Sequence, residues 1–279
     1  MPNKDEIDAA AKAAAEIVKA TPVYQDTVQP VAQEIGKALK TLGGAINVAL
    51  SPIAAMIYGY ESIKEKLKMR LEKRLANTPP ENIVVPKLQV VGPLLEKYKY
   101  VHDSDDLSQM FINLLANAMD KEKVQKAHPS FVNVISGLSP DEARLIRIIA
   151  KETVLPKLDI WVKSTKKDHT GHVHFMTNFT LLGEKAALAY PDLTPSYLSN
   201  LERLNIISCP IGSFQESYTC KNYYKPLEDD KFISDLREQV KEKEGVEIET
   251  VQGIIRITEF GQMFIDAVLV ETETPKLSH

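Results

Sequence analysis

The first half of the chain places apolar side chains at the three- and four-residue spacing of amphipathic helices. Two such stretches cover residues 4–20, which are rich in alanine, and residues 22–40, which begin at a proline. After Pro52, one apolar stripe continues to Leu75 and predicts a single long helix. The exposed side of that helix is basic and carries Lys64, Lys66, Lys68, Arg70, Lys73 and Arg74. The pattern predicts an all-helical domain over residues 1–137.

Capping residues mark three further helix starts. Asp103 or Ser104 precedes an apolar run whose first turn is acidic, which suits the dipole of a helix. A short helix is expected after His128-Pro129. The stretch 139–142 (SPDE) combines a serine cap, a proline at the first helical position and two carboxylates in the first turn.

From residue 139 onward, strands enter the pattern. Helices are expected over residues 139–153, 178–189, 194–204 and 258–270, strands over 172–175 and 253–258, and either a strand or a resumed helix over 158–163. The order helix, strand, helix, helix, strand, helix is that of a winged helix, so residues 138–279 are predicted to form a winged-helix-like α+β domain. Residues 213–250 are interpreted as a long insertion in the wing, with a charged helix over about 227–244. The predicted fold class is mainly α.

The segment from Thr41 to Tyr60 contains no charged residue and has about the length that a helix needs to cross a bilayer. It also contains Asn47, Ser51, Pro52 and three glycines, which lower its mean hydropathy. Apolar length alone does not separate two interpretations. One is a buried or partner-bound helical hairpin, and the other is a segment that enters a membrane only under certain conditions.

The composition is that of a folded protein. The chain has 34 basic and 38 acidic side chains, a net charge of −4 and 44% hydrophobic residues, which excludes global disorder and argues against a dedicated nucleic-acid coat. Its two cysteines, Cys209 and Cys220, cannot build a disulfide framework or a four-cysteine zinc site. The polar first residues argue against a secretory signal peptide, so we expect a cytoplasmic protein.

Several stretches, read in order, resemble one known family. They are residues 50–61 (LSPIAAMIYGYE), 78–83 (TPPENI) with Gly92-Pro93, 114–119 (LLANAM), 128–131 (HPSF) and 138–143 (LSPDEA). In this order and spacing the chain resembles the abortive-infection alpha family over roughly residues 45–160, and more weakly through the winged-helix-like segment. The resemblance implies a bacterial phage-defence protein, through which infected cells stop growing or die before phage is released. It supplies no established catalytic residues, so none is carried over.

The chain has no Walker loop, GxSxG, HExxH or GxGxxG motif. A group of histidines invites a metal hypothesis, but no cysteine or carboxylate pattern completes a site, so they are interpreted as surface residues: His169, His172 and His174. His128 has no nucleophile or orienting carboxylate spaced with it, and Asp106 is explained by its place in the first turn of a helix. The sequence therefore predicts no enzyme activity, no cofactor and no metal.

The helix over residues 194–204 is the test of nucleic-acid binding, because it corresponds to the recognition helix of a winged helix. The side chains available there to contact bases or phosphates are Ser196, Ser199, Asn200 and Arg203, and the wing strand adds Arg256. DNA-reading helices usually carry several cations and amides. The pattern therefore favours packing or protein recognition over DNA.

Two function classes stay open. The first is a non-enzymatic abortive-infection protein, with a helical effector region that self-associates or contacts an anionic membrane under the control of a winged-helix-like sensor of an unidentified phage trigger. Its candidate residues are Ile53, Met56, Ile57, Tyr60, Lys64, Lys66, Lys68 and Arg70, because Lys/Arg clusters beside an apolar segment are attracted to anionic lipid. On activation such a protein would lie peripherally on the inner membrane. The alternative is a winged-helix DNA-binding regulator with a helical dimerisation domain.

Overall fold

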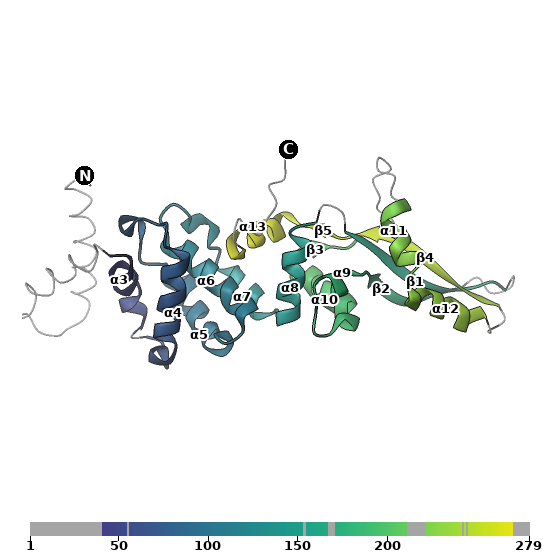
Figure 1. Ribbon diagram of the computed structural model, residues 1–279, viewed down its shortest axis with the longest axis horizontal. Helices are drawn as coiled ribbons and strands as arrows, with labels where there is room; N and C mark the ends of the chain where they lie inside the picture. The colour runs from purple at the N-terminus through teal and green to yellow at the C-terminus, as the bar shows by residue number, and fades with distance from the viewer. Residues whose placement is uncertain are drawn as a thin grey trace, which may run out of the picture. The chain divides into compact units, whose positions relative to one another are not determined.

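The computed structural model describes residues 41–269, except 55, 153–154, 167–170, 211–220, 242 and 244 (Figure 1). The helices predicted over residues 4–20 and 22–40 lie outside the described residues. The chain divides into two compact units that are discontinuous in sequence. The first unit comprises Met1–Tyr100 and Leu115–Ala127, and the second comprises Val101–Leu114 and His128–His279. The predicted domains, 1–137 and 138–279, stay predictions.

The first unit is helical throughout its described elements. It contains α3 (Leu42–Ala54), α4 (Tyr60–Arg74), α5 (Leu88–Val101), the end of α6 (Asp105–Met119), and the short 3-10 helices η2 (Pro80–Asn82) and η3 (Val124–Lys126). The apolar stripe predicted along α4 forms part of the core, with Ile63, Leu67, Leu71 and Leu75 all at most 2% exposed. Its fourfold spacing places these side chains on one face of the helix.

The predicted single helix from Pro52 to Leu75 is wrong. Helix α3 continues through Pro52 and ends at Ala54, and α4 begins at Tyr60. Gly59 adopts a left-handed conformation with a φ of 77°, which is strained for residues with a side chain and which ends the turn before α4. The uncharged segment therefore holds one helix, a turn and the start of a second helix.

The second unit joins helices to two antiparallel sheets. Its helices are the first part of α6, α7 (Ser130–Ser136), α8 (Pro140–Ile149), α9 (Leu182–Lys185), α10 (Thr194–Arg203), α11 (Lys221–Glu228), α12 (Lys231–Lys241) and α13 (Glu259–Val268), with η4 (Pro191–Leu193) before α10. The helix predicted over residues 178–189 is much shorter, because Asn178 and Phe179 still belong to a strand and Ala187 has a left-handed φ of 48°. Helical geometry is therefore confined to the residues between them.

The larger sheet has the strand order β2-β1-β4. Its strands are β1 (Pro156–Ser164), β2 (His172–Phe179) and β4 (Val246–Ile254), and a separate two-stranded sheet pairs β3 (Ile207–Ser208) with β5 (Arg256–Ile257). The stretch 158–163, which fitted either a strand or a helix, is part of β1. Every residue of β1 pairs with a residue of β4, from Pro156 opposite Ile254 to Ser164 opposite Val246.

The described residues of the insertion predicted over 213–250 contribute to this sheet and to the helices that cover it. It supplies the first residues of β4 and two helices, α11 and α12, in place of the one predicted charged helix. These helices lie against the sheet, where Leu158 packs with Tyr224 and Leu227, and Ile160 packs with Ile233 and Leu236 (Figure 1). Helices α11 and α12, which the sequence analysis placed in an insertion of the wing, therefore cover the apolar face of β1.

The opposite face of β1 buries an ion pair. The ammonium group of Lys157 lies 2.8 and 2.9 Å from the two carboxylate oxygens of Asp159, and both side chains are at most 1% exposed. The same carboxylate accepts a hydrogen bond from the backbone N–H of Asn178 at 2.9 Å, where β2 bends. Buried charges require such partners, since an unpaired one costs several kcal/mol.

The described residues are mainly helical with small antiparallel sheets, as the sequence predicts at that level. In chain order α8, α9, α10, β3 and β5 follow one another with the large sheet inserted between them. The winged-helix character of residues 138–279 stays a prediction.

Leu201 is fully buried in α10, with 0% of its surface exposed. Truncation in Leu201→Ala should lower the free energy of unfolding by about 2–5 kcal/mol, because it removes buried methyl groups and leaves a cavity. Chemical denaturation of the full chain measures the change. The matched control is Leu193→Ala, since Leu193 is 47% exposed and its loss should cost much less. Equal effects of the two substitutions would contradict the packing of α10.

Candidate functional site

Helix α8 begins at a capping box, as the SPDE stretch predicts. The Ser139 hydroxyl accepts a hydrogen bond from the backbone N–H of Glu142 at 3.2 Å, and the Glu142 carboxylate accepts one from the backbone N–H of Ser139 at 2.6 Å. These bonds satisfy two N–H groups that a helix start otherwise leaves without partners. The start of α8 is therefore a rigid point from which other side chains are positioned.

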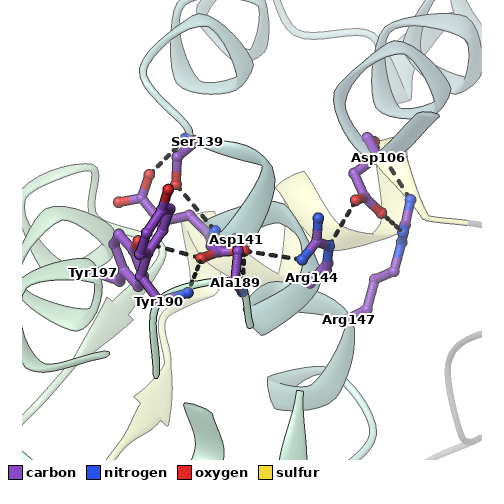
Figure 2. A network of polar contacts seen from close by, with 9 residues as sticks. Asp106, Ser139, Asp141, Arg144, Arg147, Ala189, Tyr190 and Tyr197 are labelled. Atoms are coloured by element: carbon purple, nitrogen blue, oxygen red, sulfur yellow. Dashed lines mark hydrogen bonds and ion pairs between the residues drawn. The ribbon is translucent and has the colours of Figure 1, made fainter. Parts of the chain in front are cut away.

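The carboxylate of Asp141, in the first turn of α8, is buried and joins three segments (Figure 2). It accepts hydrogen bonds from the backbone N–H groups of Ala189 and Tyr190, each at 3.0 Å, and from the hydroxyl of Tyr197 at 3.3 Å. It also forms an ion pair with Arg144 at 3.0 Å. One side chain thus holds α8, the turn before η4 and the first turn of α10.

The electrostatic environment keeps Asp141 ionised. Burial alone raises the pKa of this carboxyl, but the hydrogen bonds from Ala189 and Tyr190 and the charge of Arg144 outweigh burial and lower it below its ordinary value. A carboxylate accepts about four hydrogen bonds, and here four donors surround it. With its acceptor positions occupied and its pKa lowered, Asp141 acts as a structural cross-link and is a poor general base.

A second carboxylate extends this network. Asp106, in the first turn of α6, pairs with Arg144 at 2.9 Å and also with Arg147. The hydrogen bond to Asp106 raises the pKa of Arg144. The sequence explained Asp106 by the dipole of its own helix alone and missed both arginines, which lie 38 and 41 residues away.

Two of the predicted DNA-contacting residues are brought together by α10. The amide of Asn200 donates to the backbone carbonyl of Gly137 at 3.0 Å and to the carboxylate of Glu142 at 2.6 Å. Its carbonyl oxygen accepts from the Arg203 guanidinium, at 3.0 Å from Nε and 2.7 Å from Nη2. Asn200 is therefore bound within the protein on both sides of its amide.

The remaining residues of that set stand apart from this cluster. The hydroxyl of Ser199 donates to the backbone carbonyl of Pro195 at 3.0 Å, within its own helix. Ser196 is exposed on α10, and Arg256 is exposed on β5. Contact of these residues with DNA stays a prediction.

An open groove of about 600 Å³ lies between α7, the end of α10 and the start of α13. Its lining includes Asn133 and Val134 of α7, Arg203 and Asn205 at the end of α10, and Phe260 of α13. The Phe260 ring packs edge-on against Phe131, with ring centres 5.4 Å apart. Of these residues the sequence named only Arg203, since α7 and α13 are far from α10 along the chain.

The candidate residues in the first unit divide by exposure. Ile53, Ile57 and Tyr60 are each at most 8% exposed, whereas Met56 is 66% exposed. Burial raises the pKa of the Tyr60 hydroxyl. The basic candidates of α4 are all partly exposed: Lys64, which pairs with Glu61 at 3.3 Å, and Lys66, Lys68 and Arg70.

The turn between α3 and α4 adds an aromatic side chain that the sequence reasoning missed. Tyr58 is 92% exposed, and its backbone carbonyl accepts a hydrogen bond from the Lys99 ammonium at 2.9 Å. Tyr58 and Met56 are thus apolar side chains presented on a turn that α5 holds in place. No helix within residues 41–269 that the structure describes has the length and apolar content to span a membrane.

The histidine and cysteine candidates are placed only in part. His172 and His174 are exposed on β2, where His172 lies 3.2 Å from Glu249 and His174 packs edge-on against Trp161. Burial raises the pKa of the Cys209 thiol to about 12, so it stays protonated at neutral pH. His169 and Cys220 lie outside the described residues, among which no three metal-binding side chains gather. The predicted absence of a metal and of enzyme activity stays a prediction.

Comparison with known proteins gives one family. A family model described as abortive infection alpha matches residues 59–268, from the start of α4 to the end of α13. An uncharacterized protein from the hydrocarbon-degrading marine bacterium Alcanivorax borkumensis SK2 has a similar solved structure, at 16% identity, 52% coverage of this chain and 92% of that chain. Its TM-score is 0.32, which is too low to show a shared fold. No curated protein matches the chain.

Replacing Asp141 tests the cross-link directly. Asp141→Asn removes the charge that four donors surround, and it should lower the free energy of unfolding by about 3 kcal/mol at neutral pH. Denaturant titration of the full chain measures this loss. The control is Asp192→Asn, because Asp192 is exposed nearby, and that variant should unfold like the wild type.

The pH dependence of the same pair of proteins gives a second readout. Because the pKa of Asp141 is lower in the folded chain than its ordinary value of 3.8, the stabilisation is fully present above that value and is lost as the pH falls through the folded pKa. The stability difference between wild type and Asp141→Asn should therefore be constant near neutral pH and shrink below about pH 3.8. A difference that persists unchanged into acid would contradict the assignment.

Proposed function

The chain belongs to the abortive infection alpha family, and from that premise we propose that it limits phage spread by halting or killing the infected bacterial cell through binding rather than catalysis. The observation that carries the proposal is the extent of the family match, which spans elements of both units. The closed polar network around Asp141 supports a binding role, since its charged groups are used to fix helices and are not presented in a reactive cluster.

The first unit is the proposed effector region, acting by self-association or by contact with the inner membrane. Its support is the turn between α3 and α4, where Met56 and Tyr58 are exposed, together with the partly exposed basic face of α4. Exposed apolar side chains near cations suit either a protein partner or an anionic lipid surface. The protein would then be cytoplasmic at rest and peripheral to the membrane once activated.

The second unit is the proposed sensor of a phage-derived trigger, with a winged-helix-like core. The order of α8, α9, α10, β3 and β5 supports that comparison. The same order favours the alternative function, a DNA-binding regulator. Against it stand the engagement of Asn200 inside the protein and the scarcity of cations on α10 and β5, where Arg203 and Arg256 are the arginines available. Duplex binding with a steep salt dependence would favour the regulator.

Phage challenge tests the proposed function. In a bacterial host that expresses the chain, phage released per infected cell should fall while the survival of infected cells does not rise. One-step growth curves and counts of surviving cells at high phage input measure these quantities. Leu67→Asp, which places a charge in the core of α4, is the unfolded control. Infected cells that survive and resume growth would indicate a different kind of defence, and unchanged phage yield would contradict a defence role.

Membrane contact is tested separately with lysines of α4. Changing Lys64, Lys66 and Lys68 to Gln should weaken binding to vesicles that contain phosphatidylglycerol by about tenfold or more, since each basic residue near an anionic surface contributes about 1 kcal/mol. Co-sedimentation with vesicles measures the affinity. The matched control changes Lys225, Lys231 and Lys241, which are exposed on α11 and α12 of the second unit. Equal vesicle binding by the wild type and both variants would contradict membrane contact through α4. Self-association would then remain as the proposed effector mechanism.

A further inference from the structure

The groove between α7, α10 and α13 contains polar groups that the protein itself does not satisfy. Arg203 has five N–H donors and uses two of them on Asn200. The side-chain amides of Asn133 and Asn205 are exposed, and they form no hydrogen bond within the part of the chain that the structure describes. Three side chains therefore line one groove with unused hydrogen-bonding capacity.

The exposed guanidinium of Arg203 is oriented by hydrogen bonds within the protein. Both of its bonds end on the same oxygen of Asn200, whose own amide is held by Gly137 and Glu142. Asn205 has a left-handed φ of 58°, and its backbone carbonyl accepts a hydrogen bond from the Thr258 hydroxyl. Prior ordering of these groups reduces the entropy that binding would cost.

The groove also has an apolar part, beside Ser130, Ser136 and Gly137. Val134, Leu204 and Phe260 supply the apolar surface, and Phe260 is held by its edge-on contact with Phe131. A volume of about 600 Å³ is within the usual range for sites that bind small ligands or short segments. Apolar contact with a few oriented polar groups is the usual composition of such sites.

The charge of the groove selects the kind of ligand. Its lining holds one cation, Arg203, and no carboxylate. Binding of a nucleic-acid strand requires several protein cations along its phosphates. The groove supplies one, and the whole protein has a net charge of −4. A single guanidinium pairs instead with a single carboxylate, and side-chain amides such as those of Asn133 and Asn205 match the N–H and C=O groups of a peptide backbone.

We propose that this groove binds an extended peptide segment of a protein partner, with one carboxylate of that segment paired to Arg203. The carboxylate is an aspartate or glutamate side chain or a chain terminus. This inference rests on the proposed function, in which the second unit is the sensor. It adds the chemical class of the trigger, which is an acidic peptide segment.

A peptide library measures the binding with the purified full chain. Immobilised hexapeptides with one fixed Asp or Glu are compared with the same library carrying Asn or Gln at that position. The wild type should be retained about tenfold or more by the acidic library over the amide library, and Arg203→Gln should lose this preference. Asn133→Ala should weaken retention without abolishing the preference for acid.

The matched control is Arg256→Gln, since Arg256 is an exposed arginine on β5 outside the groove lining. That variant should bind like the wild type, and the melting temperatures of all variants should agree. Equal retention by the two libraries, absence of retention, an equal loss in Arg256→Gln, or preference for a single-stranded oligothymidine over the acidic peptides would each overturn the proposal. Phage protection is measured independently, so failure of the groove and failure of the defence role give different results.

Discussion

Burial of one carboxylate at the start of α8 is the constraint on which the core of the second unit depends. An ionised Asp141 inside a protein is tolerated only if donors surround it, and those donors come from a turn and a helix about 50 residues further along the chain. Satisfying this single group fixes where the chain after α9 lies against α8. The capping box beside Asp141 fixes the first turn of α8, and the ion pair of Arg144 with Asp106 connects α8 to α6.

The sequence predicted the helices whose signals are local. The capping box located the start of α8, Pro195 marked the first turn of α10, and the apolar stripe located the buried face of α4. The end of α9 was harder to predict, because an alanine in a left-handed conformation, such as Ala187, carries no compositional mark that separates it from a helical alanine. Gly59 does carry such a mark, since glycine favours left-handed turns, but the apolar stripe from Ile53 to Leu75 continues across it and indicated one helix.

The candidate site was predictable only where its residues share one element. Arg203 and Asn200 were named because both lie on α10, whereas Asn133 and Phe260 come from helices that the sequence separates from it by many residues. The hydrogen-bond donors to Asp141 could not be predicted from the sequence, because two of them are backbone N–H groups that almost any residue would supply. Periodicity reports which face of an element is buried, but it does not report what lies against that face.

The proposed defence role, acting through binding, depends on two surfaces of the chain. The first unit presents exposed side chains on a turn, and the second presents an anchored arginine in a groove. Each surface belongs to its own compact unit, so each can be altered by substitution without disturbing the core of the other.

The pairing of β1 with β4 bears on how the chain reaches this structure during synthesis. The two strands are separated by about 80 residues, so β1 emerges from the ribosome long before its partner exists. Until β4 and the helices α11 and α12 are made, Leu158 and Ile160 lack the side chains that cover them. Long-range pairing of this kind slows folding. The second unit is thus completed late in translation, and a chain truncated before residue 221 would lack the helices that cover Leu158 and Ile160, leaving these side chains open to chaperones and proteases.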